Sequence, residues 1–307
     1  IELAWRWLEG RVIAITGTKG KSTTTTLTAR MLTEAGFDVT AGGNLGIALS
    51  AQVADSRPES LHVVEVSSFQ LEAIDTFRPW IAVLLNLSPD HLDHHASFEE
   101  YAAAKQRIFA NQTADDWAVV NQDDPPALAL ARQARARRFD FPLDSSLPEG
   151  VTVEGGQIVR RDRSSSVPLL PLSSVRLPGR HLLGDVLAAA AVGCVAGVPA
   201  AAMQRAVEGF TGLEHALEPL GEIGGVQFVN DSKATNIEAA RRAIEAFATG
   251  LVVIMGGSRF AYRAWKEGHF GSLVTKPGAT PVLVLGAGAA AAILLKELAG
   301  NPAWRVV

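Results

Sequence analysis

The sequence predicts an α/β fold, in which a first domain built on a helix-covered parallel sheet is followed by a second, Rossmann-like α/β domain. Short and nearly continuous apolar runs alternate with helical patterns, which is typical of strands buried on both faces of a parallel sheet. A glycine-rich turn joins the first of these runs to a helix. The chain of 307 residues is long enough for two domains that each bury a core.

The first domain is predicted to span residues 1–212. Its expected strands are Val12–Thr16, Leu61–Val66, Ile81–Leu87 and Trp117–Asn121, and its expected helices are Ser22–Ala35, Leu45–Ala54, Phe98–Ala110 and Pro126–Ala136. Short β-like pieces at Val151–Glu154 and Gln157–Arg160 predict a small side sheet. Residues 180–209 have the pattern of two helices.

The second domain is predicted to span residues 213–307, after a linker near residues 210–215. Its expected strands are Val226–Asn230, Leu251–Gly256, Pro281–Gly286 and Trp304–Val307, and its expected helices are Asn236–Ala248 and Ala289–Ala299. Gly286 and Gly288 follow a strand as in a dinucleotide-binding turn, but the third glycine is missing, so this signal is weak. The abrupt ends of the chain predict that it is part of a longer protein.

Charge and composition exclude some classes of partner. The net charge is −4, and no apolar run reaches about 18 residues, so we expect no nucleic-acid partner and no membrane insertion. No signal peptide is recognisable, which predicts a cytoplasmic protein. The single cysteine, Cys194, lies in an alanine-rich run and is expected to be a small buried residue.

The most informative motif is the run GTKGKST at residues 17–23. It is a shortened P-loop, GxxGK[ST], because Ile15 stands where the longer pattern has a glycine. Backbone N–H groups of such a turn bind phosphate at the positive end of the helix, a lysine adds charge, and a hydroxyl can bind Mg²⁺. The alternative is a solvated turn. The candidate phosphate-binding residues are Gly17, Thr18, Lys19, Gly20, Lys21, Ser22 and Thr23.

Two more strand ends carry polar groups at the edge where open α/β sheets bind ligands. Glu65 ends a strand and suits Mg²⁺, although Ser67 or Ser68 could simply cap a helix there. The run NLSPDHLDHH at residues 86–95 indicates a metal or phosphate site, or else a solvated acidic loop. Zinc is conceivable, but the P-loop favours Mg²⁺.

Further candidates lie on either side of the predicted domain boundary. Lys105 occurs in a helical pattern, and composition alone predicts a surface lysine. In the run NDSKATN at residues 230–236, Asp231 could accept hydrogen bonds from a ribose. Lys233 could bind phosphate or carboxylate, and Thr235 could add a hydroxyl.

Taken together, the motifs resemble those of the Mur ligase family. GTKGKST, EVSSFQLE, NLSPDHLDHH, YAAAKQRIF, GRHLLGD and NDSKATN occur in the family's order and spacing. SSFQLE and NDSKATN are similar to the strings of members that add D-glutamate to UDP-N-acetylmuramoyl-L-alanine. The resemblance covers a central P-loop ATPase domain and most of a C-terminal Rossmann-like domain. The family's N-terminal UDP-binding domain and its far C-terminal segment have no counterpart here.

The resemblance implies an ATP-dependent amide ligase of peptidoglycan-precursor synthesis. ATP turns a carboxylate into an acyl phosphate, and an amine then displaces the phosphate. The implied cofactors are ATP and two Mg²⁺ ions. The implied partners are the small molecules UDP-N-acetylmuramoyl-L-alanine and D-glutamate, and we expect a monomer.

The resemblance also implies roles for individual residues. Lys21 and Ser22 would hold ATP phosphates and one Mg²⁺, and Glu65 with His91 would hold the second Mg²⁺. Lys105 aligns with the lysine that the family carbamylates. The remaining assignments are Asn44 and Ser67 to the muramoyl substrate, His181 and Asp185 to the adenine-side helix, Asp231 to the ribose, and Lys233 and Thr235 to the D-glutamate side.

Several positions depart from the family pattern. Leu182 and Asp185 replace asparagines on the adenine side, and Ala216 replaces an arginine. The common GGxDKG string reads GGSRFA at residues 256–261, so Phe260 replaces the lysine and Arg259 is one residue displaced. Two alternatives follow: a Mur-like ATP-binding protein or scaffold without ligase activity, or a ligase for another amino acid.

Overall fold

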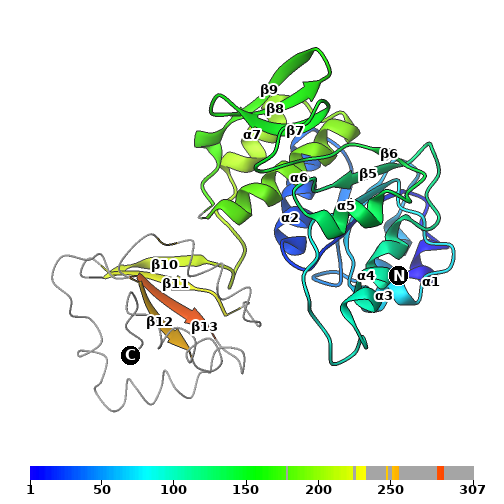
Figure 1. The fold of residues 1–307 in the computed structure, drawn as a ribbon, viewed down its shortest axis with the longest axis horizontal. Helices are drawn as coiled ribbons and strands as arrows, with labels where there is room; N and C mark the ends of the chain where they lie inside the picture. The colour runs from blue at the N-terminus through cyan, green and yellow to red at the C-terminus, as the bar shows by residue number, and fades with distance from the viewer. Residues whose placement is uncertain (178, 224–225, 233–246, 248–250, 256–281, 287–307) are drawn as a thin grey trace. The chain divides into compact units, whose positions relative to one another are not determined.

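The computed structural model describes residues 1–177, 179–223, 226–232, 247, 251–255 and 282–286. They belong to two compact units (Figure 1). The first unit contains residues 1–176 and 182–210, and the second contains residues 177–181 and the chain from residue 211 onward. Within the described ranges, every helix is too short or too polar for a membrane span.

The first unit is built on a six-stranded parallel sheet with the strand order β2-β3-β1-β4-β5-β6. The strands are β1 (Arg11–Thr16), β2 (Val39–Gly43), β3 (Leu61–Glu65), β4 (Ile81–Leu84), β5 (Trp117–Val120) and β6 (Arg137–Arg138). All four predicted strands of this domain are confirmed. The prediction missed β2, whose VTAGG sequence ends in two glycines, and β6, which has two residues.

Helices precede, connect and follow these strands in the chain. They are α1 (Glu2–Trp5), α2 (Lys21–Glu34), α3 (Ser68–Glu72), α4 (Phe98–Gln106), α5 (Pro125–Ala131), α6 (Arg180–Ala196) and α7 (Ala200–Glu208), with 3₁₀ turns η1 (Leu49–Asp55), η2 (Arg107–Phe109) and η3 (Leu172–Ser174). The expected helix Leu45–Ala54 is wrong, because a turn at Gly46, with φ of 73°, is followed only by the 3₁₀ segment η1. Cys194 on α6 is half-buried rather than fully buried, and its burial raises the pKa of the thiol to about 12.

Two smaller sheets complete the described structure. The predicted side sheet is confirmed as β7 (Gly150–Glu154), β8 (Gln157–Asp162) and β9 (Ser165–Pro171), all antiparallel. The second unit has the strand order β10-β11-β13-β12, with β10 (Glu218–Ile223) antiparallel to β11 (Val226–Asn230) and the strands β12 (Leu251–Met255) and β13 (Val282–Gly286) parallel. Three predicted strands are thereby confirmed. The predicted strand Trp304–Val307 and the two predicted helices lie almost entirely outside the described residues.

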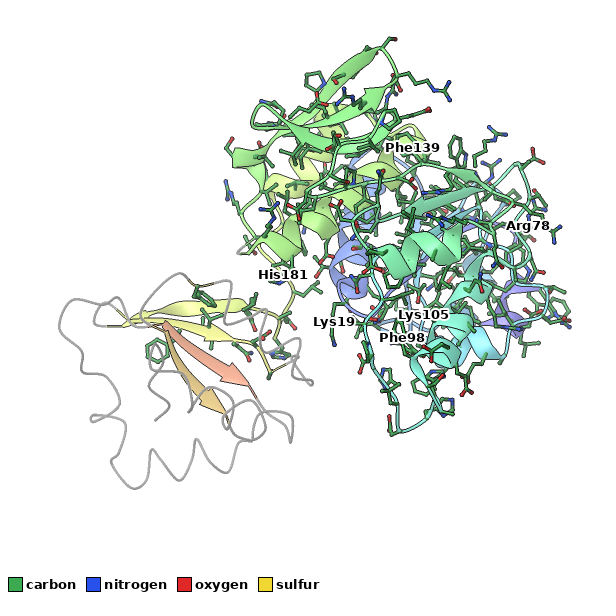
Figure 2. The ribbon with its side chains drawn as sticks, in the orientation of Figure 1. Lys19, Arg78, Phe98, Lys105, Phe139 and His181 are labelled. Carbon is green, nitrogen blue, oxygen red and sulfur yellow. The ribbon has the colours of Figure 1, made fainter. Side chains whose placement is uncertain are left out.

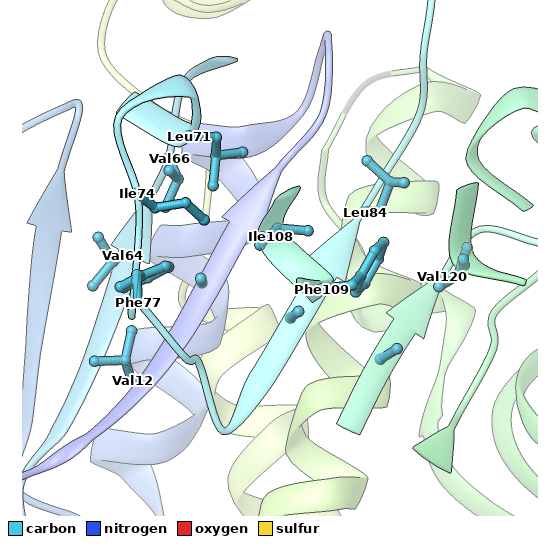
Figure 3. Packing of buried hydrophobic residues seen from close by; sticks show 14 of the residues in the cluster. Val12, Val64, Val66, Leu71, Ile74, Phe77, Leu84, Ile108, Phe109 and Val120 are labelled. Atoms are coloured by element: carbon cyan, nitrogen blue, oxygen red, sulfur yellow. The ribbon is translucent and has the colours of Figure 1, made fainter. Parts of the chain in front are cut away.

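The core of the first unit explains why its strands have such apolar sequences. Alternate residues of β1 are buried on opposite faces of the sheet, with Val12 and Ile13 both fully inaccessible. Helix α2 packs on one face, and α3, α4 and α5 contribute buried residues to a cluster on the other. Members of that cluster shown in Figure 3 include Val12, Val64, Leu71, Phe77, Leu84 and Ile108. The sheet is therefore a rigid support for the loops at its carboxyl edge.

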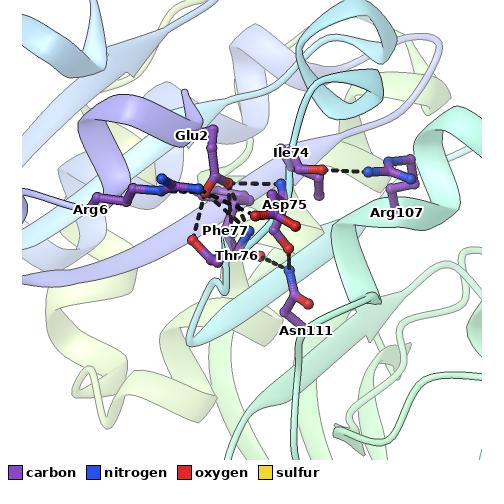
Figure 4. Close-up of polar contacts among 8 residues, drawn as sticks. All are labelled: Glu2, Arg6, Ile74, Asp75, Thr76, Phe77, Arg107 and Asn111. Atoms are coloured by element: carbon purple, nitrogen blue, oxygen red, sulfur yellow. Dashed lines mark hydrogen bonds and ion pairs between the residues drawn. The ribbon is translucent and has the colours of Figure 1, made fainter.

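Glu2 ties the N-terminal helix to the loop after α3 (Figure 4). Its carboxylate accepts the backbone N–H groups of Asp75, Thr76 and Phe77 at 2.9–3.0 Å. It also accepts the Thr76 hydroxyl at 2.6 Å and the Arg6 guanidinium at 2.9 Å. Burial by itself raises the pKa of Glu2, but the hydrogen bonds from Thr76 and the neighbouring backbone outweigh it and lower the pKa to about 2.

Glu2→Gln is expected to destabilise the protein by about 2 kcal/mol at neutral pH, the usual value for hydrogen bonds to a charged group. A carboxylate with a depressed pKa stabilises the fold above its ordinary pKa of 4.5, and this contribution is lost as the pH falls toward 2. Urea unfolding at several pH values measures the difference. A gap between the proteins that stays constant down to pH 2 would contradict this account.

Candidate nucleotide and metal site

The predicted P-loop lies between β1 and the N-terminus of α2. Gly20 has a φ of 84° and is the N-cap of α2, and its carbonyl accepts the N–H of Thr24 at 2.9 Å. A Cβ added to Gly20 would lie 2.0 Å from Oδ1 of Asp185, a residue of α6. Both the backbone conformation and the close approach therefore require glycine at this position. Thr23 is buried in the first turn of α2.

The chain that leaves β4 holds the P-loop in place. Asn86 accepts the N–H of Thr18 with its carbonyl and the N–H of Lys19 with its side-chain oxygen, both at 2.9 Å. Its amide donates back to the Lys19 carbonyl at 3.0 Å. The Tyr101 hydroxyl lies 3.0 Å from Thr18 Oγ1, and burial raises the pKa of this tyrosine. Sequence reasoning missed both supports, although Asn86 begins the NLSPDHLDHH run.

Glu65 stands where three loops meet. The register of β3 pairs Glu65 with Ile15 of β1 and Gly43 of β2, so the carboxyl ends of these strands coincide. Its side chain is only 3% exposed, and its carboxylate accepts the Ser22 hydroxyl at 2.7 Å and the Asn44 amide at 3.1 Å. A carboxylate beside a hydroxyl is a donor set of the kind that Mg²⁺ prefers. The residues present therefore fit the metal that the motif implies.

Two lysines converge on one carbonyl oxygen of the P-loop. Nζ of Lys21 donates to the carbonyls of Gly17 at 3.0 Å and Thr18 at 3.1 Å. Nζ of Lys105, from α4, donates to the same Gly17 carbonyl at 3.0 Å and to Thr16 Oγ1 at 3.2 Å. Lys105 and Lys19 are labelled in Figure 2, and after burial and the charge of Lys21, the charge of Lys19 also contributes to lowering the pKa of Lys105.

The expectation of a surface position for Lys105 is wrong. The side chain is 2% exposed, because α4 packs it beneath the loop with Nζ 4.9 Å from the centre of the Tyr101 ring. Burial, followed by the nearby charge of Lys21, holds the pKa of Lys105 well below its ordinary value. A buried lysine with a depressed pKa is a candidate functional group.

The loop after Asn86 reaches the P-loop through Asp90, whose carboxylate lies 3.4 Å from Nζ of Lys19. His91 has a φ of 54° and is exposed. Its ring lies 5.1 Å from the ring of Phe69 and 6.5 Å from that of Tyr101. Among the described residues, His91 therefore belongs to an aromatic cluster, and no hydrogen bond joins it to Glu65.

The capping interpretation of the EVSSFQLE run is confirmed for Ser67. Its hydroxyl accepts the N–H of Gln70 at 3.3 Å, and the Gln70 side chain accepts the N–H of Ser67 at 3.0 Å, which forms a capping box at the start of α3. Ser67 is half-buried, so part of its surface still faces solvent. A role toward substrate stays a prediction.

The residues predicted for adenine and ribose divide between the units, with Asp185 in the first unit and His181 and Asp231 in the second. His181 and Asp185 lie one turn apart on α6, and Asp185 is buried against Gly20. Asp231 accepts the N–H of Leu217 at 3.1 Å. Burial raises the pKa of Asp231 to about 6. The predicted residues Lys233 and Thr235, together with Arg259 and Phe260, lie outside the described residues.

Comparison with known proteins gives a family match and close relatives. The family description "Mur ligase middle domain" matches residues 15–193. The UDP-N-acetylmuramoylalanine–D-glutamate ligase of Acidobacterium capsulatum is 49% identical over 259 residues, covering 84% of this chain and 56% of the relative. The ligase of the same name from Solibacter usitatus is 41% identical over 302 residues, covering 98% of this chain and 66% of the relative. The chain thus spans less than two thirds of the length of these relatives.

Solved structures share the fold. The MurF ligase of Thermotoga maritima, in complex with ADP, matches with a TM-score of 0.66 and 19% identity, covering 96% of this chain and 81% of the other. At that identity the likeness concerns the fold alone. It agrees with the α/β fold class predicted from the sequence.

Proposed function

This chain belongs to the Mur ligase family, and from that premise we propose that it carries the nucleotide-binding part of an ATP-dependent ligase. The reaction that we propose is addition of D-glutamate to UDP-N-acetylmuramoyl-L-alanine, the substrates being suggested by the names of the relatives. The observation that carries the proposal is the convergence of Lys21, Ser22, Glu65 and Lys105 on one loop at the carboxyl edge of the sheet.

Each residue has a part in the proposed mechanism. The N–H groups of the P-loop and the three donors of Lys21 bind and orient the ATP phosphates, and Ser22 and Glu65 would hold Mg²⁺. Mg²⁺, when bound, supplies positive charge that offsets the charge on the phosphates. The substrate carboxylate attacks the γ-phosphorus, which yields ADP and an acyl phosphate. The amine of D-glutamate then attacks the acyl carbon, phosphate leaves, and the amine loses a proton.

Lys105 is proposed to carry a carbamate in the active protein. Carbamate formation joins the amine nitrogen to the carbon of CO₂ with loss of one proton, and it requires the neutral amine. The depressed pKa of Lys105 supports this step, since it increases the share of the neutral amine at a given pH. The resulting anion would lie near Lys21, whose charge contributes to lowering that pKa.

The test is a phosphate-release assay of the full-length protein with ATP, Mg²⁺, UDP-N-acetylmuramoyl-L-alanine and a panel of amino acids. We expect release with D-glutamate only. Release with a different amino acid would reassign the acceptor. Nucleotide binding without any release would overturn the ligase proposal and favour an ATP-binding scaffold, which the replacements at Leu182 and Ala216 motivate.

A further inference from the structure

A group of side chains that could bind a metal ion lies outside the P-loop site. Glu72 ends α3, and His94 and His95 lie in the loop that leads to α4. The Glu72 carboxylate receives one imidazole at each oxygen: Nε2 of His94 lies 3.0 Å from Oε2, and Nδ1 of His95 lies 3.1 Å from Oε1. All three candidate ligand atoms are within 4.8 Å of one another.

The buried nitrogen of His95 is the decisive detail. The side chain of His95 is 0% exposed, yet its Nδ1 makes no hydrogen bond, because the approach to Glu72 lacks the required geometry. The other nitrogen, Nε2, lies 3.0 Å from the Ser68 hydroxyl. Nδ1 is therefore a buried polar atom without a hydrogen-bond partner, 3.1 Å from a carboxylate oxygen. A cation bound by both atoms would give this nitrogen a partner.

We propose that Glu72, His94 and His95 bind Zn²⁺ or a similar first-row transition ion, with solvent completing the coordination. Zinc sites place ligand atoms about 2.0–2.2 Å from the metal, so tetrahedral neighbours lie roughly 3.3 Å apart. The observed separations of 3.0 and 3.1 Å involve different oxygens of Glu72. The three ligand atoms lie within 4.8 Å of one another, so they would have to draw together around the ion. Two imidazoles and one carboxylate favour zinc over Mg²⁺, which prefers oxygen ligands. Ser68 is the outer partner that orients the His95 ring.

The proposed ion would clamp the loop before α4 onto α3. The His91 carbonyl accepts the backbone N–H groups of both His94 and His95 at 3.0 Å, so the loop is already a compact turn. The Phe69 ring lies 4.6 Å from the ring of His94 and 5.7 Å from that of His95. An ion bound to both histidines and to Glu72 would hold this turn against α3. It would thereby fix the position of His91. This inference goes beyond the proposed ligase activity, since it concerns a separate metal and a separate set of residues.

Calorimetric titration of tag-free full-length protein with Zn²⁺ tests the site. We expect zinc binding that saturating Mg²⁺ does not displace. Glu72→Gln and His94→Gln, at two partly exposed positions, should each weaken binding by about 100-fold. Asp93→Asn is the control for Glu72→Gln, because it removes one negative charge next to His94. His215→Gln is the control for His94→Gln, because it breaks another histidine–glutamate contact, of 3.5 Å. Both controls should bind zinc as the wild type does.

Visible absorption of the Co²⁺-loaded protein is a second readout that does not depend on catalysis. The wild type and both controls should show the intense visible bands of Co²⁺ at a low coordination number. The Glu72 and His94 variants should not show them. Circular dichroism identifies any variant that fails to fold. Zinc affinity equal in all five proteins, absence of zinc binding to the wild type, or complete displacement by Mg²⁺ would each overturn the proposal.

Discussion

Lys21→Ala is expected to lower the turnover of the full-length ligase by at least about 1,000-fold, the scale of effect seen when a charge that stabilises a phosphoryl-transfer transition state is removed. Nζ of Lys21 is already held over the P-loop by the carbonyls of Gly17 and Thr18. Alanine removes this charge and all three donors, including the two hydrogen bonds to the loop carbonyls. The measurement is ADP formation with saturating substrates.

Arg30→Ala is the matched control, because it removes one positive charge from the same helix. Arg30 lies about two and a half turns beyond Lys21, is exposed, and donates to the Gly209 carbonyl at 2.9 Å. Its turnover should stay close to that of the wild type. Wild-type turnover in Lys21→Ala would show that the P-loop assignment is wrong. Equal losses of turnover in both variants would mean that the effect comes from the change in net charge.

The parts of the site that could be predicted from sequence are those encoded locally. A strand, a glycine-rich turn and a helix are consecutive in the chain, so the P-loop at residues 17–23 could be recognised directly. Glu65 could be predicted to lie beside the P-loop because parallel strands end at one edge of the sheet. The observed register pairs Glu65 with Ile15, next to that loop. The capping role of Ser67 follows from the glutamine three residues later.

Contacts between distant segments were beyond such reasoning. Asn86 supports Lys19 across 67 positions, and Lys105 reaches Gly17 across 88 positions. Composition predicts an exposed lysine, since a charged side chain is costly to bury. Only the packing of α4 beneath the loop reverses that expectation. The 3₁₀ segment η1 was mistaken for part of a helix for a local reason, because the turn at Gly46 interrupts the expected helix just before it.

Lys105→Met is expected to lower turnover by at least about 100-fold while stabilising the unliganded fold at neutral pH. Methionine has a similar length and carries no charge, so the substitution removes a buried amine that folding must desolvate. The depressed pKa of Lys105, caused first by burial and then by Lys21, implies such a penalty. Turnover falls because the variant has neither an amine nor a carbamate beside Gly17.

The pH dependence of the stability gain follows from the direction of the pKa shift. Between the lowered pKa of Lys105 in the folded protein and the ordinary lysine pKa of 10.5, the unfolded chain binds a proton that the folded protein has given up, so wild-type stability rises with pH over that range. The variant lacks this dependence, and its advantage should shrink over the same range. Urea unfolding in CO₂-free buffer measures both proteins, with Gln106→Met, at the next residue of α4, as a control for added apolar surface. The opposite result, a wild type more stable than Lys105→Met at neutral pH, would contradict this account. It would mean that the hydrogen-bond partners of Lys105 stabilise its charged form.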